Sequence, residues 1–148
     1  MKSVIVYTSL AHGNTEKVAK AMAEALKADL SRTTDTVPET LNDYDLVGFG
    51  SGIYNGQHHK EIFDLVERMP AIKGKKVFVF STSGYGKASS NDSLKKKLMG
   101  KGFRVVGGFI CKGFDNYRVN KRYIEDTKGR PNDKDLQEAR AFARGLIF

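Results

Sequence analysis

The sequence predicts an α/β fold built around a parallel sheet, and two observations carry this prediction. Strand-like and helical segments alternate along the 148 residues, which is typical of successive βαβ units. The expected strands are nearly continuous apolar runs, as in parallel strands that helices cover on both faces. A chain of this length, 40% hydrophobic, is expected to form one domain over residues 1–148 with a core of its own.

Apolar runs predict four strands, over residues 4–7, 46–50, 77–80 and 105–111. A further strand is expected near residues 30–33, where the apolar pattern is weaker. No internal repeat and no low-complexity stretch interrupts this series, so the alternation extends along the whole chain.

Helical periodicity predicts four helices, over residues 15–28, near 58–69, over 90–99 and over 133–146. The second is expected to end at Pro70, because proline cannot continue a helix. The N-terminus of the last helix is expected to be stable, because Asn132 can cap it and acidic residues occupy its first turn.

The loop over residues 9–15 has the features of an anion site, because it joins the first strand to a helix N-terminus. Gly13 lets the backbone approach a phosphate, and Ser9, Asn14 and Thr15 add short polar side chains. A loop with one glycine and no lysine is neither a Walker loop nor a dinucleotide fingerprint. It favours a single static phosphate monoester, with a plain capped helix start as the alternative.

Two further strand-exit loops are expected beside the first, because ligands of parallel sheets bind beyond the carboxyl ends of the strands. They cover residues 51–56 and 81–86, and both are rich in glycine and small hydroxyls. Each contains one tyrosine, Tyr54 and Tyr85, and these two rings could enclose a flat ligand. The alternative is that both tyrosines only anchor their loops.

The charge is +8 and unevenly distributed. Residues 73–130 hold 15 basic and 4 acidic residues, whereas the rest of the chain is slightly acidic. A lysine run such as residues 95–97 is usually a solvated helix face, but the clustering over the whole segment favours acidic partners.

The composition also predicts the cellular compartment of the protein. The single cysteine, Cys111, excludes an internal disulfide framework, fits a reducing cytoplasm and is expected to be a small buried hydrophobe. Apolar runs are far shorter than the roughly 20 residues of a membrane span. A strand is expected almost at the first residue, so neither a membrane span nor a secretory signal is predicted.

Over nearly its whole length the chain resembles the flavodoxin family. The resemblance is carried by residues 5–7 leading into 9–16, by residues 45–51 and by residues 80–84. It implies a flavodoxin-like three-layer α/β/α sandwich of the short-chain type, with a five-stranded parallel sheet in the order 2-1-3-4-5. Three features depart from the family: a first loop one residue longer, a basic segment where flavodoxins are acidic, and no tryptophan.

The resemblance further implies that the chain binds FMN without a covalent bond. The phosphate would be held by the first loop, with His12 as an additional donor: Ser9, Leu10, Ala11, His12, Gly13, Asn14 and Thr15. The isoalloxazine ring would lie between the second and third loops: Ser51, Gly52, Ile53, Tyr54, Asn55, Gly56, Thr82, Ser83, Gly84, Tyr85 and Gly86. No metal site is expected at the adjacent His58 and His59, which lack a third ligand and lie at a predicted helix start.

The favoured function is an electron carrier between redox proteins with acidic docking surfaces, because no catalytic acid or base is apparent. The cations expected near the flavin are Lys87, Lys112, Arg118, Lys121 and Arg122. The alternative is an FMN-dependent oxidoreductase, either a quinone or NAD(P)H reductase or a protein similar to flavodoxin-type protoporphyrinogen oxidases. Its substrate would meet the basic loop of residues 113–130, which carries Tyr117 and Tyr123. A nucleic-acid-binding module is disfavoured, because no reader motif is present.

Overall fold

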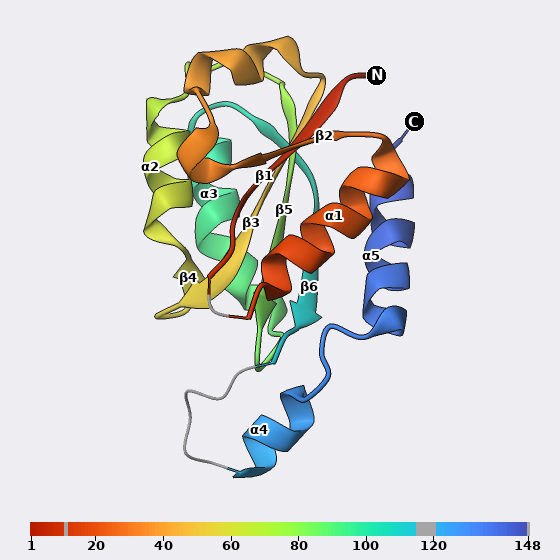
Figure 1. Cartoon of the computed structure of the whole chain (residues 1–148). Helices are drawn as coiled ribbons and strands as arrows, with labels where there is room; N and C mark the ends of the chain where they lie inside the picture. Colours follow the sequence, from red (N-terminus) through yellow and green to blue (C-terminus); the bar gives the residue numbers. More distant parts are fainter. Residues whose placement is uncertain (11, 115–120, 148) are drawn as a thin grey trace.

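Five parallel strands form the sheet of this computed structural model, which describes residues 1–10, 12–114 and 121–147, without the side chains of residues 121–123. Their order is β2-β1-β3-β5-β6 (Figure 1). The strands are β1 (Ser3–Thr8), β2 (Asp29–Arg32), β3 (Leu46–Tyr54), β5 (Lys76–Ser83) and β6 (Arg104–Lys112). Taken in chain order these five have the predicted order 2-1-3-4-5, so both the parallel sheet and its topology are confirmed.

A sixth short strand, β4 (Gln57–His58), was not predicted. It pairs antiparallel with the end of β3, and a turn at Asn55 and Gly56 connects the two strands. Both turn residues have positive φ, 52° and 81°, as a two-residue hairpin of the Asn-Gly type requires. The helix expected near residue 58 therefore begins later, because the backbone of His58 is used in the hairpin.

Helices cover both faces of the sheet (Figure 1). The four predicted helices are present as α1 (Asn14–Leu26), α2 (Lys60–Arg68), α3 (Asp92–Gly100) and α5 (Asp133–Arg144). A fifth helix, α4 (Lys121–Thr127), occupies part of the segment that was expected to be only a loop, because two turns are too short to show a helical period. The 3-10 turns are η1 (Thr33–Asp35), η2 (Pro38–Asp43) and η3 (Ala88–Asn91). In the part of the chain that the structure describes, no helix has the length and apolarity to cross a membrane.

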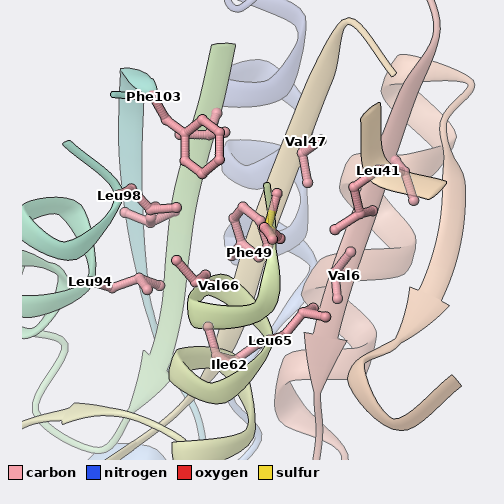
Figure 2. Packing of buried hydrophobic residues seen from close by; sticks show 14 residues of the cluster. Val6, Leu41, Val47, Phe49, Ile62, Leu65, Val66, Leu94, Leu98 and Phe103 are labelled. Atoms are coloured by element: carbon pink, nitrogen blue, oxygen red, sulfur yellow. The ribbon is translucent and has the colours of Figure 1, made fainter. Parts of the chain in front are cut away.

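Successive strand residues alternate between two cores, one on each face of the sheet. Figure 2 shows Val6 and Phe49 packed against the apolar side chains of α2 and α3. Ile5 and Phe78 point to the other face and join the core beneath α1 and α5. Coverage on both faces was predicted for every strand, but the side chains of β6 are mostly only half-buried. The reason is that β6 is an edge strand, which pairs with β5 alone among the described strands.

The central strands β3 and β5 pack unusually closely at two glycines. Gly48 and Gly50 are the register partners of Phe78 and Phe80. A Cβ atom on Gly48 would lie 2.2 Å from the Phe78 ring, and one on Gly50 would lie 2.1 Å from the Phe80 ring. Each phenylalanine ring therefore occupies the space that a side chain on the neighbouring strand would take.

This packing predicts that Gly50→Ala destabilises the protein by about 1–3 kcal/mol, because the Phe80 ring must leave its place in a close-packed core. Urea unfolding measures the effect. Gly100→Ala is the matched control, because no atom beyond its own stretch of helix lies within 4 Å of the Cβ it would add. Equal unfolding free energies for the two variants would contradict the expected steric conflict.

Candidate functional site

A cleft of about 760 Å³ lies where β1, β3, β5 and β6 end, within the roughly 300–1,000 Å³ usual for small-molecule sites. All three predicted loops contribute to its lining. The lining residues are Leu10, His12, Asn14, Thr15, Gly52, Ile53, Tyr54, Asn55, Gly56, Thr82, Ser83, Gly84, Tyr85, Lys87, Ser90, Gly113 and Phe114. The structure therefore brings together most of the residues singled out from the sequence.

Four of the predicted residues do not line the cleft: Ser9, Gly13, Ser51 and Gly86. Ser9 Oγ accepts a hydrogen bond from the N–H of Glu16 at 3.2 Å, so it supports the first turn of α1. Ser51 is fully buried. The predicted residue Ala11 lies outside the described residues, as do Tyr117 and Arg118 of the basic loop.

Gly13 shapes the first loop. It occupies the N-cap position of α1 with φ 70° and ψ 23°, a left-handed conformation that suits glycine. A Cβ atom on Gly13 would find no other atom within 4 Å, so the space beside it is open. The N–H groups of the first turn of α1 have no intrahelical acceptor, and the helix dipole adds partial positive charge. This end of the cleft can therefore hold a phosphate.

A wall at this end of the cleft comes from the exit of β6. Lys112 of this exit was expected near the flavin, but Gly113 and Phe114 were not named as lining residues. Asn14 Nδ2 donates to the carbonyl oxygen of Phe114 at 2.9 Å. The rings of His12 and Phe114 meet edge to face, with centroids 4.6 Å apart. Gly113 allows this approach, because a Cβ there would lie 2.6 Å from Asn14 Nδ2. Extending the strand-exit rule to the last strand would have identified Gly113 and Phe114.

Two buried hydroxyls join the first loop to the third. Thr15 Oγ1 and Thr82 Oγ1 lie 2.8 Å apart, and both side chains line the cleft. Ser83 Oγ accepts a hydrogen bond from the N–H of Gly86 at 2.9 Å, which closes the third loop on itself. These bonds hold the two loops in a fixed relation beneath the cleft.

The two predicted aromatic residues, Tyr54 and Tyr85, line the cleft with 40% and 51% of their surface exposed. A tyrosine that only anchored its loop would be expected to bury its ring, so this exposure favours a ligand-contacting role. Lys87 Nζ lies 5.4 Å from the centroid of the Tyr85 ring. The aromatic part of the cleft therefore carries a positive charge at its edge.

His58 is a buried support of the hairpin and not a lining residue. Its side chain is 1% exposed, and Nε2 lies 2.8 Å from the carbonyl oxygen of Phe80. Because a carbonyl only accepts, Nε2 carries the proton, and the buried Nδ1 has no partner among the described residues. Burial lowers the pKa of His58 to about 4, although the bond to Phe80 opposes this shift.

Cys111 is buried, as predicted, and burial raises the pKa of its thiol to about 12. Such a thiol stays protonated near neutral pH and is a poor nucleophile. Within residues 1–10, 12–114 and 121–147, no group of three His, Cys, Asp or Glu residues could hold a metal ion.

The comparisons with known proteins agree with this fold. A flavodoxin domain model matches residues 4–113. An uncharacterised protein of Methanocaldococcus jannaschii is 41% identical, over 99% of both chains. The flavodoxin-like domain-containing protein BilS of Clostridioides difficile is 25% identical, over 100% of this chain and 97% of BilS. An NAD(P)H dehydrogenase (quinone) of Archaeoglobus fulgidus is also 25% identical, over 97% of this chain and 95% of that protein.

Among solved structures, a flavodoxin from the domain Archaea superposes with a TM-score of 0.74. The match covers 99% of this chain and 96% of that protein, at 19% sequence identity. At this identity the likeness shows the shared fold.

The buried histidine predicts a pH-dependent stability. Between pH 6.5 and about 4 the unfolded chain binds a proton at His58 that the folded chain does not bind. The contribution of neutral His58 is therefore complete above pH 6.5 and lost as the pH falls toward 4. The stability difference between wild type and His58→Gln should decrease by about 3 kcal/mol from pH 7 to pH 4. Parallel pH profiles in urea unfolding would contradict this assignment.

Proposed function

The chain belongs to the flavodoxin family, and from this premise we propose that it binds FMN in the cleft and carries electrons between redox partner proteins. The observation that carries the proposal is the cleft itself. A cradle for one phosphate and two partly exposed tyrosines line the same cavity, at the carboxyl edge of a parallel sheet.

The donor set fits FMN better than a nucleoside triphosphate. The phosphate end offers helix N–H groups, small hydroxyls and the imidazole of His12, whereas the first loop contains neither lysine nor acidic residue. These groups suit a phosphate that is held and not transferred. In this proposal the first loop, with Thr15 and Asn14, binds the phosphate, while Gly52 to Gly56 and Thr82 to Gly86 surround the ring.

Bound FMN supplies the redox chemistry, and the protein supplies binding, orientation and electrostatics. Tyr54 and Tyr85, which line the cleft, are partly exposed to solvent. A docked protein could therefore approach the ring directly, as electron exchange requires. The described lining residues include no carboxylate that could act as an acid or base.

The partner is proposed to be acidic at its docking surface, because two lysines lie at the aromatic side of the cleft. Lys87 lines the cleft, and the side chain of Lys112 lies beside Gly86, 3.1 Å from the position of a Cβ there. These cations attract carboxylates mainly by raising the rate of encounter. Of the other expected cations, Arg118 and the side chains of Lys121 and Arg122 lie outside the described residues.

Other cations of the basic segment stabilise the fold at the opposite edge of the sheet. Lys101 Nζ donates to three carbonyl oxygens at the end of α2, those of Val66, Glu67 and Met69, at 2.6–2.8 Å. Lys75 Nζ similarly binds carbonyl oxygens at the end of η2. The net charge of the segment therefore overstates the charge available to a partner.

The alternative function is an FMN-dependent oxidoreductase, and the similarity to the quinone-dependent NAD(P)H dehydrogenase of Archaeoglobus fulgidus favours it. Steady-state turnover of a quinone with NADH or NADPH separates the two functions. A carrier reduces the quinone only when a partner reductase is supplied.

The proposal predicts that riboflavin, which lacks the phosphate, binds about 10- to 100-fold more weakly than FMN, because charge-assisted hydrogen bonds are lost. Titration of the apoprotein with both ligands measures the ratio. Gly13→Val should weaken FMN binding and leave riboflavin binding nearly unchanged. Gly74→Val is the matched control, because Gly74 also has positive φ and open space but lies outside the cleft. Equal affinities for the two ligands would refute the phosphate site.

The charge distribution predicts that Lys87→Glu lowers the rate of electron transfer to an acidic acceptor on the order of tenfold at low salt. Stopped-flow rates across a salt series measure this effect, and the difference should shrink at high salt because the charges are screened. Lys73→Glu makes the same charge change at an exposed position outside the cleft and should have a much smaller effect. A faster reaction of the wild type with a basic acceptor at low salt would exclude an acidic partner.

A further inference from the structure

Tyr54 is partly exposed, yet its ring is held by its own strand. Gly52 and Tyr54 lie two residues apart on β3, so they face the same side. A Cβ atom on Gly52 would lie 3.1 Å from the Tyr54 hydroxyl oxygen and 3.4 Å from the ring. The ring therefore lies back over Gly52, where a side chain would be in tight contact with it. The backbone of Tyr54 is fixed as well, because it pairs with Gln57 across the hairpin turn.

His59 contacts the Tyr54 ring at a right angle. The ring centroids are 5.1 Å apart and the planes meet at 90°. This edge-to-face arrangement is one that aromatic pairs prefer. Tyr54 thus has a neighbour across its ring as well as Gly52 beneath it.

The imidazole of His59 is oriented by groups outside the cleft. Its Nδ1 accepts the backbone N–H of Glu61 at 3.0 Å and so caps the N-terminus of α2. An accepting Nδ1 carries no proton, which leaves the ring proton on Nε2. The backbone N–H of His59 donates to Ser51 Oγ at 2.9 Å, and Ser51 is completely buried in β3. The bond from Glu61 of α2 therefore orients the imidazole, and Ser51 of β3 holds the backbone of His59.

We propose that His59 is the positioning residue for Tyr54 and thereby sets the aromatic wall of the ring site. This inference rests on the proposed function, because it takes Tyr54 to flank the flavin. The cap bond fixes the imidazole, and the imidazole in turn restricts the side-chain rotamers open to Tyr54. Ser51, which was expected to contact the ring, does not line the cleft and accepts the N–H of His59.

The two functions of the His59 side chain, capping α2 and contacting Tyr54, can be separated by substitution. His59→Asn keeps a good helix-capping group and removes the aromatic ring. His59→Phe keeps an aromatic ring and removes the acceptor. His59→Ala removes both, and Tyr54→Ala gives the signal expected when the wall itself is lost.

The experiment measures flavin fluorescence in each FMN-loaded variant, together with its urea midpoint. We expect His59→Phe to quench FMN within about twofold of wild type but to unfold at lower urea, because α2 loses its cap. We expect His59→Asn to unfold near the wild-type midpoint while its fluorescence rises severalfold toward that of Tyr54→Ala. This crossed pattern distinguishes positioning of Tyr54 from a purely structural role.

Two results would overturn the proposal. Wild-type quenching in His59→Asn would show that the side chain serves only as a cap. Unchanged fluorescence in Tyr54→Ala that still binds FMN would show that Tyr54 does not flank the flavin, and FMN binding itself would stand. Failure of the wild-type chain to bind FMN, in contrast, would overturn the proposed function together with this inference.

Discussion

The site depends on the packing of two phenylalanine rings of β5 over two glycines of β3. This contact admits one register, in which Gly50 pairs with Phe80, and it places Ser51 beside Ser81 and Gly52 beside Thr82. A slip by one residue would turn both rings to the other face of the sheet. Because the register is set inside the core, the second and third exit loops leave the sheet at the same level.

The two ends of the cleft are lined by different kinds of groups, polar at one end and aromatic at the other. At the end proposed to hold the phosphate, a left-handed glycine, the start of α1 and a pair of buried hydroxyls provide a polar surface, and the exit of β6 lies against it. At the end proposed to hold the flat ring, the surface is aromatic and partly exposed. There His58 bonds to Phe80 beneath the hairpin, and His59 contacts Tyr54. A ligand with one phosphate and one flat ring matches this division.

The basic segment serves the fold and the site in separate places. Lys75 and Lys101 satisfy carbonyl groups at helix ends near the starts of β5 and β6, so their charge is used within the protein. Lys97 pairs with Glu67, and Arg130 with Asp135. Lys87 and Lys112, in contrast, lie beside the third loop at the cleft. A partner at the cleft would therefore meet these lysines beside the third loop and exposed apolar groups elsewhere, including Leu10 of the first loop, which is 53% exposed.

The sequence by itself determined the parallel sheet, its four main helices and the three loops of the cleft, because apolar runs, caps and glycines act through near neighbours. Tertiary structure decided the rest. The bond from Asn14 to Phe114 joins residues 100 positions apart, and that between Thr15 and Thr82 spans 67. The Asn-Gly turn of the hairpin is a local signal, but the burial of His58 against the carbonyl oxygen of Phe80 depends on β5 lying beside the hairpin. No local pattern encodes such contacts, because they exist only once the strands have paired.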